Sequence, residues 1–458
     1  MEQNEMIRQQ KVPKRILTSL IASVSAGVVP RSGAPYIAIG RKDEIAAFLS
    51  DLELINDGGG TMRFLIGRYG SGKSFLMQLI RGYALERDFL TADCDLSPER
   101  RLYGSGGNGV ATYRELMKNL ASKSSADGGA LQKIIAKWIF QLESELGTQE
   151  NDDPERIAAV LEKEIRRQLA ELEFLVGGYD FSRVIREYYL AVKAGNEAGA
   201  SACLRWLRGE YSTKTEAKRD LGFDVSLVIG DGNWYDFLKL WAALSHRMGY
   251  RGLLVFIDEC VNLYKIPHRV SRENNYEKIL SMFNDTLQGR ASYLGLVFGG
   301  TPQFLEDTRR GLFGYEALRS RLCDSRFSVE GCRNFVGPVI RLTRLTDDEL
   351  LALVVRMTAL HGQNFNWEPR VTEEDQIRFL KVCLERAGAD SMITPREMLR
   401  DYMTVLNILM QNPDIKFSDI VVGTGDAGSG NRNGNSVEND HMPEENDATR
   451  FDPDDIDF

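Results

Sequence analysis

The sequence predicts an α/β fold built on a parallel sheet, with a large helical insertion, an all-helical C-terminal lid and an acidic tail. Three observations carry this prediction. Short apolar runs alternate with segments of helical periodicity, longer helical stretches interrupt and follow that alternation, and residues 423–458 hold almost no apolar side chains. At 458 residues the chain is long enough to bury a full core and to form about two or three structural units.

Composition narrows the class of protein. The six cysteines form no CxxC pair and only four histidines are present, so we expect neither a zinc site nor a disulfide framework, and a reducing cytoplasm is the natural location. No stretch reaches about 18 apolar residues, so no membrane span is predicted. The net charge is −9, but residues 423–458 hold ten Asp or Glu against two Arg, so the rest of the chain is nearly neutral. Bulk charge therefore neither argues for nor excludes nucleic-acid binding.

Residues 1–35 predict an N-terminal helical segment, with a short helix over about 13–26 and a Pro/Gly-rich link after it. Basic residues before the apolar run 16–29 imitate a secretion signal. Serine and threonine dilute that run, and Glu2 and Glu5 precede it, so we interpret it as a helix rather than a signal.

Residues 36–112 predict the first part of the core. The expected order is a helix that ends at a triple glycine, a strand over 62–66, a glycine loop, a helix over 74–86 and a strand over 89–94, which is typical of a βαβ unit. Residues 113–222 change to helical spacing, clearest from Ile157 to Val176 and closed by Gly177 and Gly178, and they predict a helical insertion.

Residues 223–345 predict the second part of the core. Its expected elements are a helix over 234–248, a strand over 253–257, a helix around 276–287 and strands over 294–298 and 339–342. These three strands are apolar on both faces, as buried parallel strands are. Helices over about 347–360, 373–385 and 395–410 predict a lid over residues 346–422. The tail, 423–458, lacks the apolar content that would offset the entropy of ordering, so we expect it to be disordered.

A phosphate-binding motif, GxxxxGK[ST], is matched in full by Gly67-Arg68-Tyr69-Gly70-Ser71-Gly72-Lys73-Ser74. Glycines allow backbone N–H groups to converge on phosphate oxygens beside the positive end of the following helix. We expect Lys73 to bridge the β- and γ-phosphates of ATP and Ser74 to bind Mg²⁺. The alternative, a chance match in a glycine-rich turn, leaves the flanking strand and helix unexplained.

Two carboxylates follow the apolar strand 253–257. Asp258 is expected at the carboxyl edge of the sheet, where it is the second candidate ligand of Mg²⁺. Glu259 is the candidate that orients and deprotonates the attacking water. The alternative is a strand that ends in a solvated acidic turn.

Three further catalytic candidates each have a structural alternative. Thr301, after the strand 294–298, is expected to sense the γ-phosphate or to hold the attacking water. Alternatively, its hydroxyl forms a hydrogen bond within its own turn beside Pro302. Arg319 and Arg321 lie about 200° apart on a helix, so at most one of them can act as an arginine finger that contacts the γ-phosphate in a neighbouring subunit. The alternative is that both are ordinary exposed arginines on the surface. Arg396, in the helix start Thr394-Pro395-Arg396-Glu397, faces phosphate or pairs with Glu397 or Asp401.

A short basic stretch follows Glu259 and is a candidate contact for DNA. It contains Lys265, His268, Arg269 and Arg272. A solvated loop is the other interpretation.

The order of these motifs resembles the AAA+ class, in particular its branch near the origin-recognition and STAND ATPases, over about residues 36–412. The segment Ile39-Gly40-Arg41-Lys42-Asp43-Glu44 is similar to the one that packs beside adenine in those proteins, which implies a nucleotide contact for Arg41. The resemblance also implies that Arg321 is the finger and Arg396 the second sensor. Thr301 stands where many AAA+ proteins have Asn, and the insertion has no counterpart in the minimal fold.

The loop with Phe75 and Leu76 after it, together with Asp95-Leu96-Ser97-Pro98-Glu99-Arg100-Arg101-Leu102, looks like the ATP-binding proteins of BREX-type phage-defence systems (BrxD-like). This resemblance implies a cytoplasmic bacterial or archaeal ATPase that binds ATP through residues 67–75. Its expected partners are further copies of the chain, with an Arg finger in trans, and DNA or a helicase-type defence protein. Two alternatives stay open: a STAND-like signalling switch, and a nucleotide-bound scaffold without DNA contact whose acidic tail docks a basic partner.

Overall fold

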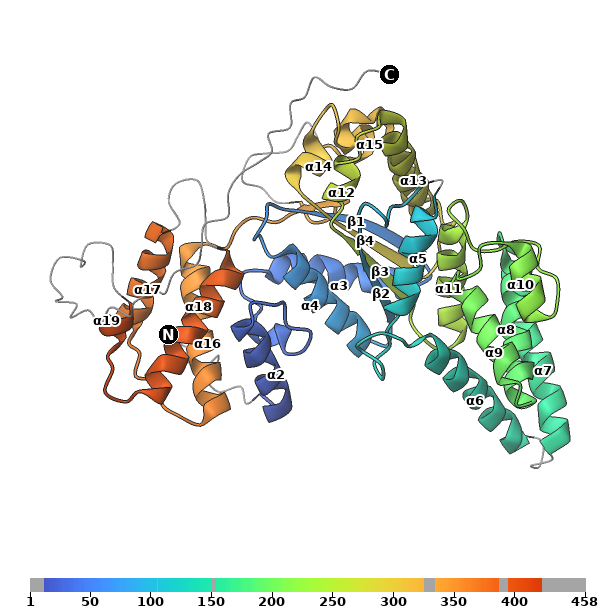
Figure 1. Cartoon of the computed structure of the whole chain (residues 1–458), viewed down its shortest axis with the longest axis horizontal. Coiled ribbons are helices and arrows are strands. Elements are labelled where there is room, and N and C mark those ends of the chain that lie inside the picture. Colours follow the sequence, from blue (N-terminus) through green and yellow to red (C-terminus); the bar gives the residue numbers. More distant parts are fainter. Residues whose placement is uncertain (1–11, 105, 150–153, 325–333, 387–393, 422–458) are drawn as a thin grey trace, which may run out of the picture.

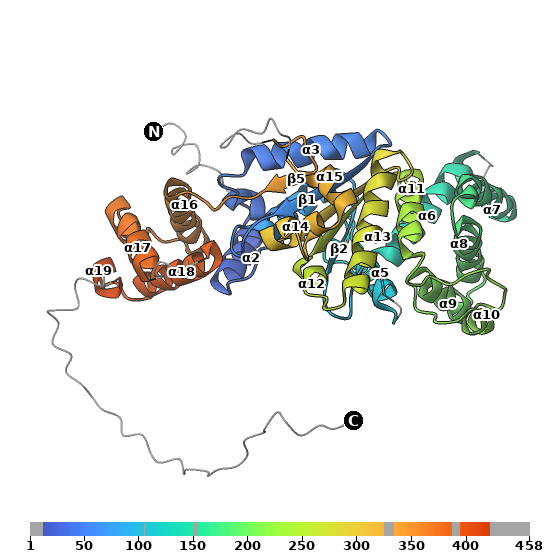
Figure 2. The ribbon, with the colours of Figure 1, turned by 90° about the horizontal axis from the view of Figure 1, so that it is seen from above.

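The computed structural model describes residues 12–104, 106–149, 154–324, 334–386 and 394–421 (Figure 1). A five-stranded, all-parallel sheet lies in the middle of the molecule, with helical regions on either side (Figure 2). The predicted α/β fold with a parallel sheet is therefore confirmed. The predicted acidic tail lies outside the described residues. No described helix has both the length and the apolar character needed to cross a membrane.

The sheet has the strand order β2-β3-β4-β1-β5. Its strands are β1 (Gly60–Ile66), β2 (Leu90–Asp95), β3 (Leu253–Asp258), β4 (Leu294–Gly300) and β5 (Val339–Arg341). Each lies where the apolar runs predict a strand. Because the strands are parallel and in register, with Ile66 opposite Gly300 and Asp95 opposite Asp258, the loops that follow them meet at one edge.

Alternate strand residues pack on opposite faces of the sheet. On one face, Leu65 and Phe256 pack with helices α3 (Lys42–Asn56) and α4 (Lys73–Glu86). On the other, Phe64 and Val255 pack into a cluster with α5 (Asn108–Lys118), α11 (Trp234–Arg247) and α13 (Arg269–Leu287). Short helices follow the strands at the carboxyl edge: α12 (Val261–Tyr264), α14 (Pro302–Glu306), η3 (Leu312–Gly314) and α15 (Glu316–Leu322).

The helices between α5 and α11 continue the second of these clusters outward from the sheet. They are α6 (Leu131–Gln149), α7 (Pro154–Ala170), η2 (Glu171–Phe174), α8 (Gly178–Lys193), α9 (Glu197–Leu207) and α10 (Lys214–Leu221). The helical spacing that extends to Val176 is misleading, because α7 ends at Ala170 and Val176 is exposed. A sharp turn causes this, since a Cβ on Gly178 would lie 1.7 Å from the Leu172 carbonyl oxygen.

Helices from the two ends of the chain form a separate core. The buried face of α2 (Lys14–Ser25), which contains Leu17, Leu20 and Ile21, packs with α16 (Asp347–Phe365), α17 (Glu373–Arg386) and α18 (Pro395–Gln411). The short helices η1 (Ala34–Ile37) and α19 (Phe417–Ile420) lie beside them. We call α2, α16, α17 and α18 the terminal helical unit. The apolar run that imitates a secretion signal is thus a core-forming helix face, while the predicted domain boundaries stay predictions.

Candidate nucleotide site

The glycine loop connects β1 to α4 and curls tightly at the carboxyl edge of the sheet. Gly72 has φ +91°, a left-handed conformation that side-chain-bearing residues rarely adopt. At Gly67 a Cβ would lie 2.2 Å from the Ser71 hydroxyl oxygen, so a side chain there would push the loop open. The glycines are therefore required for the loop to close before α4 begins at Lys73.

Lys73 lies across the mouth of this loop. Its Nζ donates hydrogen bonds to the carbonyl oxygens of Gly67, at 2.9 Å, and Arg68, at 3.2 Å. Burial lowers the pKa of Lys73, while the negative charges of Asp258 and Glu259 oppose that shift. The ammonium group is thus held by two carbonyl oxygens that phosphate oxygens can replace.

The two predicted ligands of Mg²⁺ lie in direct contact. The Ser74 hydroxyl, at the start of α4, donates to Asp258 Oδ2 at the end of β3 over 2.9 Å. Hydroxyl and carboxylate oxygens are the donors that Mg²⁺ takes, usually few from the protein and the rest from phosphate and water. Among the described residues no group of three or more His, Cys, Asp or Glu side chains is placed to hold a metal.

Glu259 adopts an unusual backbone conformation beside this pair. Its φ of +56° is in the left-handed region, and its N–H donates to Asp258 Oδ1 at 2.8 Å. Asp258 in turn requires a glycine on the neighbouring strand, because a Cβ on Gly299 would lie 2.2 Å from Asp258 Oδ1. Strained residues of this kind cluster at functional sites. The strain here places Glu259 at the wall of the cavity described next.

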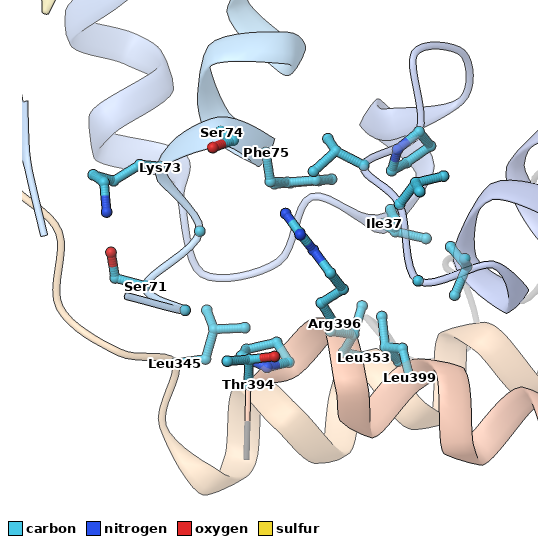
Figure 3. A pocket seen from close by; sticks show the side chains of 18 of the residues that line it. Ile37, Ser71, Lys73, Ser74, Phe75, Leu345, Leu353, Thr394, Arg396 and Leu399 are labelled. Carbon is cyan, nitrogen blue, oxygen red and sulfur yellow. The ribbon is translucent and has the colours of Figure 1, made fainter. Parts of the chain in front are cut away.

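A cavity of about 330 Å³ opens between the loop and the terminal helical unit (Figure 3). One end is polar and is formed by the loop from Tyr69 to Ser74, with Glu259 and Arg396. The other end is apolar, and its lining includes Val24, Val28, Val29, Pro30, Ile37, Ile39, Leu353 and Leu399, while Arg41, Phe75 and Leu345 line the cavity nearer the loop. Its volume is within the range of small-molecule sites, and its two ends match a phosphate chain and a planar base.

Three residues of α18 line this cavity: Pro395, Arg396 and Leu399. Figure 3 shows Arg396 pointing across it from α18 toward Phe75. Among the described residues no carboxylate lies within 4.0 Å of the Arg396 guanidinium, since Asp401 pairs with Arg400 and Glu397 closes the capping box of Thr394. Hydrogen bonds from Thr394 also hold the pKa of Glu397 below its usual value. The predicted helix start is confirmed, and neither alternative partner of Arg396 forms an ion pair with it.

Thr301 and the paired arginines lie away from this cavity. The Thr301 hydroxyl accepts the Phe304 N–H at 3.4 Å and caps α14, as the structural alternative predicts, although Thr301 also lines an open groove with Arg68. Arg319 and Arg321 are exposed on α15, where Arg321 Nη1 donates to the Ala317 carbonyl oxygen at 2.7 Å. Their role toward a neighbouring subunit stays a prediction.

The basic stretch after Glu259 is not a simple loop. Arg269 and Arg272 belong to α13, which begins earlier than its periodicity indicates. Arg272 is buried and donates to the Ile266 carbonyl oxygen at 2.8 Å, so the interpretation of Arg272 as a loop cation is wrong. Lys265 and His268 are exposed, and so is Arg269, which pairs with Glu273 at 2.7 Å.

Sequence reasoning missed two parts of the site. Residues 24–30, which wall the apolar end, carry no motif that would have revealed them. Asp95 ends β2 directly opposite Asp258, and a second acidic strand end was a signal that could have found it. Partial desolvation and the charges of Asp258 and Glu259 raise the pKa of Asp95.

A parallel α/β sheet whose glycine loop, lysine and acidic strand end meet at one cavity defines a nucleotide-binding protein. The family model described as BREX system ATP-binding protein BrxC/D matches residues 12–424, and the chain belongs to this family. ATP binding and membership of the BREX anti-phage system follow from it, as the resemblance in the sequence implies. No curated protein matches the chain.

Proposed function

We propose that this chain hydrolyses ATP with Mg²⁺ and couples its nucleotide state to assembly on DNA or to a helicase-type partner in phage defence. The observation that carries the proposal is the contact between Ser74 Oγ and Asp258 Oδ2, at 2.9 Å, with Glu259 beside it at the cavity wall. A carboxylate at this wall, beside the proposed Mg²⁺ ligands, is the kind of group that a general base requires.

Each residue has a distinct part in the proposed reaction. Ser74 and Asp258 would hold Mg²⁺, which neutralises charge on the phosphates when bound. Lys73 exchanges the carbonyl oxygens of Gly67 and Arg68 for phosphate oxygens. Glu259 orients a water molecule and accepts its proton, and Arg396 contacts the phosphates from the opposite wall.

Phosphate release from ATP and Mg²⁺ by the full chain tests hydrolysis. Glu259→Gln should slow turnover by about 10²–10³-fold, because a general base is removed while the shape of the side chain is kept. Turnover that is equal in the wild type and this variant would overturn the assignment of Glu259. The same assay with duplex or single-stranded DNA at low salt tests the coupling to DNA. The proposed coupling to DNA is overturned if the chain binds DNA in no nucleotide state.

A STAND-like switch is the second candidate, and one contact favours it. Thr394 of the terminal helical unit packs so closely on the loop that a Cβ on Gly70 would lie 2.7 Å from its Cγ2. A nucleotide held under such a closed unit is suited to slow release. One tightly retained nucleotide, slow turnover and no effect of DNA would select the switch.

The assembly state and location of the chain are further parts of the proposal. Arg321, exposed on α15, is the better candidate for a finger that acts in a neighbouring copy in the cytoplasm. The particle mass measured in each nucleotide state tests this, and Arg321→Ala should lower turnover without lowering ATP affinity.

A further inference from the structure

Arg41 is a buried cation that touches three separate parts of the molecule. We propose that Arg41 is a positioning residue that couples the phosphate loop to the terminal helical unit, so that nucleotide binding at the loop is transmitted to α16. This inference rests on the proposed nucleotide site. Arg41 also lines the nucleotide cavity, so the expected nucleotide contact stays a prediction, and the coupling rests on the hydrogen bonds that the same guanidinium makes within the protein.

Two of its hydrogen bonds join the loop to the linker between β5 and α16. Arg41 Nη2 donates to the Ser71 carbonyl oxygen at 2.9 Å and to the Thr343 carbonyl oxygen at 2.8 Å. Ser71 is in the middle of the phosphate loop, and Thr343 lies between the end of β5 and the start of α16. A movement of the loop carbonyl therefore pulls directly on the linker.

The residue before Arg41 contacts α16 itself. Gly40 has φ +71°, and a Cβ there would lie 2.3 Å from Glu349 Oε1. Glu349 belongs to the capping box that starts α16, where its side chain accepts the Thr346 N–H at 2.8 Å. Residues 40 and 41 together thus contact the loop, the linker and the first turn of α16.

The geometry requires arginine rather than another cation. Arg41 is 5% exposed, and its other terminal nitrogen, Nη1, lies 3.3 Å from Oε1 of Glu44, which is also buried. A planar guanidinium has several donors at fixed angles and stays charged, so it can hold two carbonyl oxygens and a carboxylate at once. A lysine has a single ammonium group and cannot span the same three acceptors.

Hydrogen–deuterium exchange of the full chain, with and without a non-hydrolysable ATP analogue and Mg²⁺, tests the coupling. In the wild type we expect the nucleotide to protect both residues 67–75 and residues 343–350. In Arg41→Lys we expect affinity for the nucleotide to fall about tenfold, since the shorter ammonium group cannot keep every hydrogen bond that holds the loop. At saturating nucleotide, this variant should keep the protection of 67–75 and lose that of 343–350.

Arg81→Lys is the matched control. Arg81 is buried to the same degree, pairs with Asp93 and bonds to the Ala126 carbonyl oxygen, but it touches neither the loop nor the linker. It should lower thermal stability while both regions stay protected by nucleotide. Protection of 343–350 that survives in Arg41→Lys, or is lost equally in Arg81→Lys, overturns the proposal.

Two further results keep the test decisive. If Arg41→Lys does not fold, Glu44→Gln replaces it, because the neutral amide holds Arg41 less firmly. Reduced protection of 343–350 in Glu44→Gln supports the coupling, and unchanged protection overturns it. A wild type in which the nucleotide protects neither region contradicts the proposed nucleotide site itself, whatever Arg41 does.

Discussion

Two helical regions flank the same sheet, and they are joined to it in different ways (Figure 2). The helices α6–α10 belong to the hydrophobic cluster that covers one face of the sheet, and none of their described residues lines the nucleotide cavity. The terminal helical unit has a core of its own, yet it supplies Arg396, Leu353 and other residues to the cavity wall.

The way each helical region is packed indicates which of them can move when a nucleotide binds. A region that shares its core with the sheet cannot move without opening that core, whereas a separately packed unit can shift at the cost of a few contacts. The contacts between the loop region and the terminal helical unit include the hydrogen bonds of Arg41 to the loop and to the linker before α16, and the packing of the Thr394 methyl group against Gly70. We therefore expect nucleotide to change the terminal helical unit and to leave α6–α10 in place.

The largest expected effect tests the shared core. Trp206 of α9 is fully buried and meets Phe237 of α11 edge to face at 5.5 Å between ring centroids. Trp206→Ala should cost about 3–5 kcal/mol of unfolding free energy. Urea unfolding should show the insertion and ATP binding lost in one transition. If the insertion unfolds alone while ATP still binds, it does not share its core with the sheet. Phe174→Ala, at an exposed site of the insertion, is the control.

The next effect tests the cavity wall. Arg396→Ala should weaken ATP binding by about tenfold, because the cation that points into the cavity is lost. Arg186→Ala, on α8 of the insertion, removes a cation that pairs with Glu187 and should leave ATP affinity unchanged. Titration calorimetry measures both. Equal losses in the two variants would show a general charge effect rather than a site.

A matched pair of helix caps gives a smaller effect. Thr394 and Thr213 each accept a backbone N–H at 3.2 Å, the first at the cavity and the second on α10 of the insertion. Replacing either by alanine should cost about 1 kcal/mol of stability. Only Thr394→Ala should also weaken ATP binding, because only Thr394 packs on the phosphate loop. Thr394→Ser keeps the cap and isolates the contribution of the methyl group.

The smallest expected effect is a pH dependence confined to the terminal helical unit. His361 is buried in α16, where its Nδ1 accepts from Trp367 Nε1 at 2.9 Å. Burial lowers the pKa of His361 from its usual 6.5, so the unfolded chain takes up a proton first as the pH falls below 6.5. Stability should therefore fall as the pH drops through about 6.5 and below. Thermal unfolding of His361→Gln should lack this added pH slope, while the insertion contains no histidine.

Much of the fold was predictable because its signals are local. The five strands appear as apolar runs, and the starts of α16 and α18 appear as capping boxes formed by residues three positions apart. The boundaries that failed, at Ala170 and at the start of α13, lie where packing overrides periodicity. The turn before Gly178 brings this residue against the carbonyl oxygen of Leu172, a close approach that the apolar periodicity does not record.

The candidate site divides in the same way. Gly67 to Ser74, Asp258 and Glu259 are recognisable in the linear sequence, because phosphate and Mg²⁺ chemistry demands particular residue types at strand ends. Only the folded chain shows that residues 24–30 wall the cavity and that Arg41 joins the loop to the linker before α16. Those facts depend on contacts between segments about 300 residues apart or more, as between Arg41 and Thr343. Such contacts arise from the packing of whole elements, which local spacing does not encode.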